Sequence, residues 1–338
     1  MTRRCAEVLM LIYIVRRIAL GISVLLVTLV VTFLIFFAGP ADPAQSLCAE
    51  NRCPTQKLEQ IRTSMGLDRP VTVQFAEYFK GLFVGRDIAD GGNINHCSAP
   101  CLGYSFHNHL QVKDEVFRRF PTTVALALLA MVVFLVVGVS LGVLAATKRG
   151  SPFDRTLVGV SQVFGAIPYI VIALLFALYL TVLYPVLPQT HPFSDGVGPW
   201  LIGLIAPAIV LGLVTSTSYV RYTRAQMVDT LAQDYVRTAK SKGISSRAVV
   251  YKHGLRAALS PVLTILGLDM AALLSGTLIT EQIFSVDGLG KLAITALLKT
   301  DDLPIIMGTV LLGCVIVVAL NIVVDIAYSF IDPRVRLS

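Results

Sequence analysis

The stretch TTVALALLAMVVFLVVGVSLGVLAAT, residues 122–147, contains no Asp, Glu, Lys or Arg. A helix that crosses a hydrocarbon core about 30 Å thick needs about 20 apolar residues, so this stretch is long enough. In lipid every backbone polar group must be satisfied within its own segment, which favours a membrane-spanning helix. The whole chain agrees, because 55% of its 338 residues are hydrophobic and 14% are charged, against about 25% charged in a soluble domain.

Five further stretches have the same character. Four lack charged side chains and the fifth is interrupted only by Asp269; they cover residues 18–39, 156–190, 196–220, 303–324 and 257–280. The first is longer than the 7–15-residue apolar core of a signal peptide, so we do not predict its cleavage. We therefore predict an all-α polytopic membrane protein with six spans, at residues 18–39, 122–147, 156–185, 199–220, 261–284 and 303–330.

The basic residues predict the orientation of these spans. With residues 1–17 in the cytoplasm, 17 of the 28 Lys and Arg residues are cytoplasmic, and Lys291 and Lys299 alone lie in short external loops. Nine others lie in the external segment 40–121, which is too long to count in the positive-inside rule. The loop 221–260 and the tail 331–338 are then cytoplasmic, and the net charge of +7 gives no reason to expect nucleic acid as a partner.

The external segment 40–121 is far longer than a connection needs, so we expect a small domain there. Residues 55–65 are compatible with a helix, and residues 66–70 are typical of a turn. Phe75, Phe79 and Phe83 are four residues apart and predict a helix face that packs on this domain or on the outer ends of the spans. The Gly-, Asp- and Asn-rich residues 87–95 indicate an exposed loop.

Four of the six cysteines, Cys48, Cys53, Cys97 and Cys101, lie in this external segment, where an oxidising compartment permits disulfides. Two local bridges and two crossed bridges are both compatible with the sequence. A metal site is the alternative, because thiolates and imidazoles together suit zinc or copper. No CxxC pair is present, so disulfides are favoured; the alternative ligands would be His96, Cys97, Cys101, His107 and His109.

Charged residues within or near the predicted spans are candidate pathway residues. Asp269 lies near the middle of the fifth span and Glu281 near its outer end. A charge at mid-membrane is costly, so Asp269 is expected to face a hydrogen-bonding group, a water-filled pathway or another subunit. Pro168 is expected to kink the third span. Gly138 and Gly142 form a small-xxx-small pair that permits close helix packing.

The cytoplasmic run DYVRTAKSKGISSRAVVYKHGLRAALSP, residues 234–261, is too polar for a membrane core. Met227, Leu231, Tyr235 and Ala239 recur every fourth residue, which predicts a helix over 224–242. Gly243 is suited to end that helix. Ser245 is suited to cap a second helix that runs toward Pro261.

The same run carries a family resemblance. Residues 234–243 (DYVRTAKSKG), followed by His253, Leu255, Arg256, Ala258 and Pro261, resemble the EAA loop of ABC-importer permeases, in the version found in dipeptide and oligopeptide permeases. Similar motifs elsewhere are MGLDRP at 65–70, RFPTT at 119–123, GLG at 288–290, DLP at 302–304 and DPRVR at 332–336. These cover nearly the whole chain. The cysteine-bearing stretches 48–53 and 97–101 and the charge of Asp269 depart from the pattern.

The resemblance implies a B-type peptide permease subunit with the type I importer fold, in the plasma membrane of a prokaryote with both termini cytoplasmic. It implies three kinds of partner: a homologous second permease, ABC ATPase subunits or domains, and an extracytoplasmic substrate-binding protein. It places a coupling helix, which docks on the ATPase, near Gly243. The coupling residues it implies are Asp234, Tyr235, Arg237, Thr238, Ala239, Lys240, Lys242, Gly243, Ile244 and Arg247.

The sequence contains no GxxxxGK[ST] phosphate-binding loop, so ATP and Mg are expected on the partner ATPase and no catalytic residue or cofactor is expected in this chain. Two other functions remain open at this point. One is an ion-coupled secondary transporter that uses Asp269, although no internal repeat supports it. The other is a membrane anchor or receptor whose basic segment lies on anionic lipid. Peptides, glutathione, nickel and haem are all substrates within the wider family.

Overall fold

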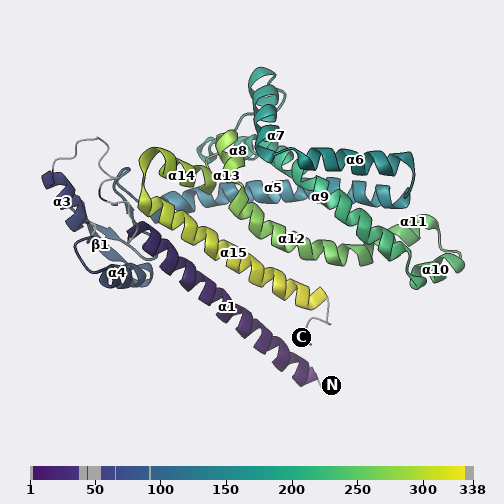
Figure 1. Cartoon of the computed structure of the whole chain (residues 1–338), viewed down its shortest axis with the longest axis horizontal. Helices are drawn as coiled ribbons and strands as arrows, with labels where there is room; N and C mark the ends of the chain where they lie inside the picture. Colours follow the sequence, from purple (N-terminus) through teal and green to yellow (C-terminus); the bar gives the residue numbers. More distant parts are fainter. Residues whose placement is uncertain (1–2, 38–43, 45–54, 65, 91–92, 332–338) are drawn as a thin grey trace. The chain divides into compact units, whose positions relative to one another are not determined.

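The computed structural model is mostly helical and describes residues 3–37, 44, 55–64, 66–90 and 93–331 (Figure 1). The chain divides into two compact units. Unit 1 comprises Met1–Thr123 and Asp287–Ile322, and unit 2 comprises Val124–Val286 and Val323–Ser338. Each unit is described by itself below.

Unit 1 contains the segment 40–121, predicted to be external, and the helices that begin or end beside it. Its helices and helical turns are α1 (Arg3–Phe37), α3 (Thr55–Ser64), α4 (Val71–Val84), the first part of α5 (Val112–Thr147), α14 (Leu289–Thr295), the π-helical turn η4 (Ala296–Thr300) and most of α15 (Leu303–Ile331).

Two short antiparallel hairpins also belong to unit 1. β1 (Arg86–Asp90) pairs with β2 (Asn93–Cys97), with Arg86 opposite Cys97 and Asp90 opposite Asn93. β3 (Tyr104–Ser105) pairs with β4 (Leu110–Gln111). The interpretation of residues 87–95 as a loop is therefore wrong. The sequence did carry a hairpin signal, because two glycines at positions 91 and 92 separate the two strands.

Aromatic side chains of α4 pack on the C-terminal end of α1, so the packed helix face predicted from the phenylalanine spacing is present. Phe75 meets Phe33 edge to face with ring centroids 5.3 Å apart, and Phe79 joins the same cluster. The centre of the buried face is Tyr78, which is 2% exposed, whereas Phe83 is 69% exposed. The buried face of α4 is therefore centred on Tyr78, and the phenylalanines lie along one edge of that face.

Unit 2 contains the remaining long helices and the segment 234–255 that was predicted to be cytoplasmic. Its elements are the rest of α5, then α6 (Pro152–Ala166), α7 (Tyr169–Phe176), η1 (Ala177–Leu183), η2 (Phe193–Asp195), α8 (Val197–Gly203), α9 (Ile205–Leu231), α10 (Asp234–Ser241), α11 (Ser246–Ala248), η3 (Val249–Leu255), α12 (Arg256–Gly276) and α13 (Leu278–Ile283).

Four helices in the described part of the chain are long and apolar enough to cross a membrane: Ile14–Phe37, Val112–Thr147, Val197–Leu231 and Leu303–Val323. A fifth span results if the pair Pro152–Ala166 and Tyr169–Leu183, bent by 92°, crosses as one broken helix. Pro168 lies at this bend and precedes α7. The predicted fifth span overlaps α12, which has 21 residues. The count of six spans stays a prediction.

Close helix packing in unit 2 depends on the two glycines of the small-xxx-small pair. A Cβ atom at Gly138 would lie 2.4 Å from the Cβ of Tyr219, and one at Gly142 would lie 2.7 Å from the Cβ of Thr223. Real Cβ atoms do not approach other atoms this closely, so glycine is required at both positions. The predicted close approach is therefore confirmed, and the neighbour of α5 along this face is α9.

Candidate functional site

The segment 234–255, predicted to be cytoplasmic, is built from short helices and is not continuous with α9. α9 ends at Leu231, and Gln233 has extended backbone angles before α10 begins at Asp234. The prediction of one helix over 224–242 is therefore wrong. The break changes the buried face, so that Val236 and Ala239 are buried while Tyr235 is 49% exposed.

The turn after α10 has the geometry that glycine favours. Gly243 has φ +79°, in the left-handed region. Its N–H donates to Lys240 O at 3.0 Å, and the Ile244 N–H donates to Ala239 O at 3.4 Å. This pair of bonds is a Schellman motif, which ends the helix sharply. The Ser245 side chain then accepts from the Ala248 N–H, which confirms the predicted cap of the second helix.

The outer side of this segment is exposed and basic. Every predicted coupling residue except Ala239 is exposed. Four of them are basic and one is acidic: Arg237, Lys240, Lys242 and Arg247, against Asp234. The only ion pair among these five that the described residues contain is Arg237–Asp234, at 3.8 Å with both side chains largely in solvent. Such an exposed pair contributes little to stability, so these charges remain accessible to a partner.

The inner side of the segment is fixed to the membrane helices by apolar packing. Val236, Ala239 and Val249 form a buried cluster with Leu231 of α9. Gly254 lies against α9, since a Cβ there would be 3.0 Å from the side chain of Leu231. The segment is therefore attached to α9 by packing, and η3 continues directly into α12.

A bidentate ion pair joins α6 to α9 in the same unit. Arg224 donates to Asp154 through Nε at 2.5 Å and through a terminal nitrogen at 2.7 Å. The Asp154 side chain is 2% exposed and also accepts from the Gly150 N–H. Asp154 was not among the residues predicted from the sequence. Its position as the one acidic residue among Lys148, Arg149 and Arg155 was the available signal.

The two carboxylates predicted as pathway residues both have hydrogen-bond partners. The Tyr219 hydroxyl of α9 donates to Asp269 of α12 at 2.8 Å. Glu281 on α13 is fully buried and accepts from the Thr277 hydroxyl at 3.0 Å. Asp269 thus has the hydrogen-bonding partner that a carboxyl group in a membrane helix requires. A pathway role for either residue stays a prediction.

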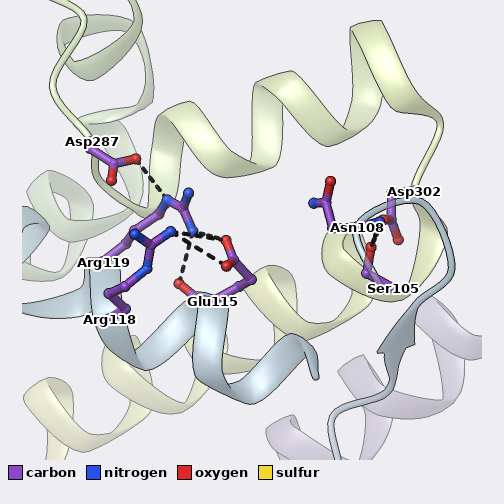
Figure 2. Close-up of polar contacts among 7 residues, drawn as sticks. All are labelled: Ser105, Asn108, Glu115, Arg118, Arg119, Asp287 and Asp302. Atoms are coloured by element: carbon purple, nitrogen blue, oxygen red, sulfur yellow. Dashed lines mark hydrogen bonds and ion pairs between the residues drawn. The ribbon is translucent and has the colours of Figure 1, made fainter. Parts of the chain in front are cut away.

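A second polar cluster lies in unit 1 at the start of α5, in the stretch that carries the RFPTT motif. Figure 2 shows Arg119 between two carboxylates: Nε donates to Asp287 at 2.7 Å, and a terminal nitrogen pairs with Glu115. The Glu115 and Arg119 side chains are 10% and 15% exposed. Nearby, the Leu289 N–H donates to the Thr123 hydroxyl at 2.9 Å. Two motifs that are far apart in the sequence, RFPTT and GLG, are therefore held together.

Figure 2 also shows Ser105 of the β3–β4 hairpin beside Asp302 at the start of α15. The Ser105 hydroxyl donates to the Asp302 carboxylate and accepts from the Asn108 N–H at 3.1 Å. Asp302 is fully buried and also accepts from the Ile305 N–H. Burial raises the pKa of the Asp302 carboxyl, and the bonds from Ser105 and Ile305 oppose that rise. From the sequence, Asp302 was visible only as part of the DLP motif.

In the segment 40–121 Cys97 and Cys101 form a disulfide. Cys48 and Cys53 lie outside the described residues. His96 bonds to Asp87 at 2.6 Å. No group of three or more His, Cys, Asp or Glu side chains placed to hold a metal ion occurs in the described part of the chain. The alternative of a metal site that uses Cys97 and Cys101 therefore has no support in this geometry.

The chain matches a known protein family along most of its length. Residues 138–337 match the family described as binding-protein-dependent transport system inner membrane component, and residues 10–127 match its N-terminal companion. The chain belongs to this family. It is therefore a multi-pass inner-membrane permease component of a transport system, with the type I importer fold. The family does not favour the ion-coupled secondary transporter considered from the sequence.

Similar proteins carry consistent names. A putative peptide transport system permease protein of Brucella abortus (strain 2308) is 36% identical, over 96% of this permease and 98% of the relative. The dipeptide transport system permease protein of Escherichia coli (strain K12) is 33% identical, over 97% and 99%. A crystal structure of an amino acid ABC transporter has a TM-score of 0.47 and 17% identity, covering 63% of this chain and 92% of that one.

Proposed function

We propose that this permease is one of two homologous membrane subunits that form the pathway of an ATP-driven importer of dipeptides and oligopeptides. The similar proteins named as peptide and dipeptide permeases support the substrate class. The proposed site is the plasma membrane of a prokaryote, with both chain ends in the cytoplasm. An extracytoplasmic binding protein would deliver the peptide, and the other partners would be a second permease and ABC ATPases.

The observation that carries the energy-coupling part of this proposal is the two-sided character of residues 234–255. The outer side is exposed and basic, and the inner side is fixed to α9 through Val236, Ala239, Val249 and Gly254. An ATPase surface of acidic character would fit the outer side. Its movement would reach the membrane helices through the inner side.

The chemistry of the cycle would then be divided between subunits. ATP and Mg would be bound and hydrolysed on the ATPases, which close on binding ATP. That closure would displace residues 234–247 and change which side of the membrane the pathway faces. This chain would contribute no catalytic group and would convert a docking contact into a helix movement.

Substitutions at Arg247 and Gly243 test this docking assignment. The tagged permease is purified from its host membrane with its partners, and uptake of radiolabelled alanyl-phenylalanine is measured in cells. Arg247→Glu reverses one of the four basic charges, so we expect loss of ATPase from the purified complex and loss of uptake. Arg155→Glu is the matched control, because Arg155 is also exposed but lies on α6 outside the segment.

Gly243 separates the effect of side-chain bulk from that of backbone strain. A Cβ at Gly243 meets nothing within 4 Å in this chain, so a clash at the Cβ itself must come from a partner. Gly243→Asn tolerates a positive φ better than Gly243→Ala does. If the partner packs against this turn, both variants impair uptake; if backbone strain alone matters, only the alanine variant does. Survival of uptake and of ATPase binding in both variants and in Arg247→Glu would contradict the docking assignment.

A further inference from the structure

A pocket of about 380 Å³ lies in unit 1, between α4, β1 and the ends of α1 and α15. This volume is within the range of small-ligand sites, about 300–1,000 Å³. Five charged side chains line it, three basic and two acidic: Arg69, Lys80, Arg86, Glu77 and Asp87. Tyr78, Tyr104 and Phe106 add an aromatic wall. Neither the family match nor the coupling segment assigns a role to this pocket.

Most of the pocket's charges already have partners. Arg69 pairs with Glu77 at 2.5 Å, and Asp87 bonds to His96 at 2.6 Å. Lys80 is exposed. Arg86 is different: it is half-buried, and its Nε is buried with no hydrogen-bond partner in the described part of the chain. A buried N–H group without a hydrogen-bond partner is costly, and an anion bound at this guanidinium would offset part of that cost.

A glycine on α4 makes space for the Arg86 side chain. A Cβ at Gly81 would lie 3.0 Å from the Cδ of Arg86, so glycine lets the stem pass against α4. The guanidinium then lies 5.1 Å from the centre of the Tyr78 ring. Burial lowers the pKa of Arg86, and the neighbouring Tyr78 and Glu77 oppose that effect. The side chain is therefore held at the pocket by the contacts of its stem with α4 and of its guanidinium with the Tyr78 ring.

We propose that this pocket binds a small ligand that carries a carboxylate, with the carboxylate on Arg86 and the apolar part of the ligand against Tyr78, Tyr104 and Phe106. Guanidinium groups bind carboxylates through two parallel hydrogen bonds, which supply both energy and geometry. The aromatic wall favours a ligand with an aromatic or large apolar group. Such a ligand is either a simple aromatic acid or the free carboxyl end of a short peptide.

The test measures equilibrium binding of radiolabelled phenylacetate to the full-length permease in lipid nanodiscs, without ATPase or binding protein. It is therefore independent of the proposed coupling function. We expect saturable binding of the labelled compound. Unlabelled phenylacetate should compete for it, and the neutral phenylacetamide should not. Competition by alanyl-phenylalanine but not by its C-terminal amide would show that the pocket also accepts the free carboxyl end of a short peptide. Equal competition by the acid and the amide would overturn the proposal, and so would absence of saturable binding.

Variants give the residue assignment. Arg86→Gln should weaken binding about ten- to a hundredfold, the usual effect of losing a charged hydrogen bond. Arg118→Gln is the matched control, because Arg118 is in the same unit, is 60% exposed and does not line the pocket. Glu77→Gln removes a pocket carboxylate and should tighten binding a few-fold, which keeps the test valid if Arg86→Gln does not fold. Unchanged affinity in both pocket variants would contradict the proposal.

Discussion

The smallest features that hold this permease together are glycines at which a single Cβ decides whether two helices can meet. Gly138 and Gly142 of α5 both lie so close to α9 that a Cβ atom at either position would clash with it. Alanine at Gly138 must push α9 away or distort Tyr219, whose hydroxyl also bonds to Asp269. The packing of one residue thus controls a polar contact between two other helices.

We predict that Gly138→Ala lowers the free energy of unfolding by about 1–3 kcal/mol, as overpacking of a close contact does. Thermal unfolding of the purified permease in detergent measures this. Gly159→Ala is the matched control, because Gly159 is inside α6 and a Cβ there meets nothing within 4 Å. It should be neutral or stabilising by up to about 1 kcal/mol, since alanine favours a helix more than glycine does. Equal destabilisation in both variants would refute the contact argument.

Asp302 gives a prediction of pH dependence at the same scale. Its pKa in the folded protein is raised by burial above the unfolded value. Between those two values the folded state holds more protons than the unfolded state, so this group lowers stability as pH rises from about 4. Asp302→Asn removes the charge; its amide oxygen can still accept from the Ile305 N–H, and its NH2 group can donate to the Ser105 hydroxyl, which reverses that bond.

We therefore expect Asp302→Asn to flatten the fall in melting temperature that occurs as pH rises from about 4 toward neutrality. Unfolding curves recorded at pH values from 4 to 8 measure the effect. Ser105→Ala is the comparison, because it removes the donor and leaves the carboxyl group, so it should raise the pKa further and steepen the fall. A slope that is the same in the asparagine variant and the native protein would exclude Asp302 as its source.

At the scale of elements, the segment 234–255 can couple ATPase movement to the membrane helices only if its inner side stays attached to α9. We predict that Val249→Ala, which creates a cavity in a fully buried contact, weakens this attachment by about 2 kcal/mol. Hydrogen exchange in residues 234–248 should become faster, and less peptide should be imported per ATP hydrolysed. ATPase binding should persist, because the exposed side is unchanged.

The control for this element is Val163→Ala on α6, the same substitution at a side chain that is 63% exposed. It should leave hydrogen exchange in residues 234–248 unchanged. If Val249→Ala leaves both exchange and coupling intact, the segment is held by something other than the apolar cluster. If it abolishes ATPase binding, the inner side contributes to docking directly.

The same segment shows what the sequence could and could not predict. The glycine turn and the Ser245 cap were predictable, because each depends on local backbone chemistry. The break at Gln233 was not, since the spacing of Met227, Leu231, Tyr235 and Ala239 fits an unbroken helix equally well. The Asp154–Arg224 and Arg119–Asp287 pairs join residues 70 and 168 positions apart. Periodicity carries no information about such distances.

At the scale of the whole molecule, the bent pair α6 and α7–η1 decides the topology. Lys148 follows α5, and Lys240 lies on α10 after α9. If the bent pair crosses the membrane, two crossings separate these lysines and they lie on the same side. If it turns back, only α8–α9 crosses between them and they lie on opposite sides. The positive-inside rule favours the first arrangement, since both loops are rich in basic residues.

We predict that a membrane-impermeant amine reagent labels Lys148, Lys240 and Lys242 together in inside-out vesicles and labels none of them in right-side-out vesicles. All three side chains are exposed, so protection would reflect the membrane and not the fold. Lys80 of the external segment is also exposed and should show the opposite pattern. Mass spectrometry of the digested permease reads out each lysine without any mutation. Labelling of Lys148 and Lys240 from opposite sides would mean that α6 and α7 form a re-entrant hairpin. Residues 234–247 would then lie on the opposite side of the membrane from Lys148, and an ATPase on the same side as Lys148 could not reach them.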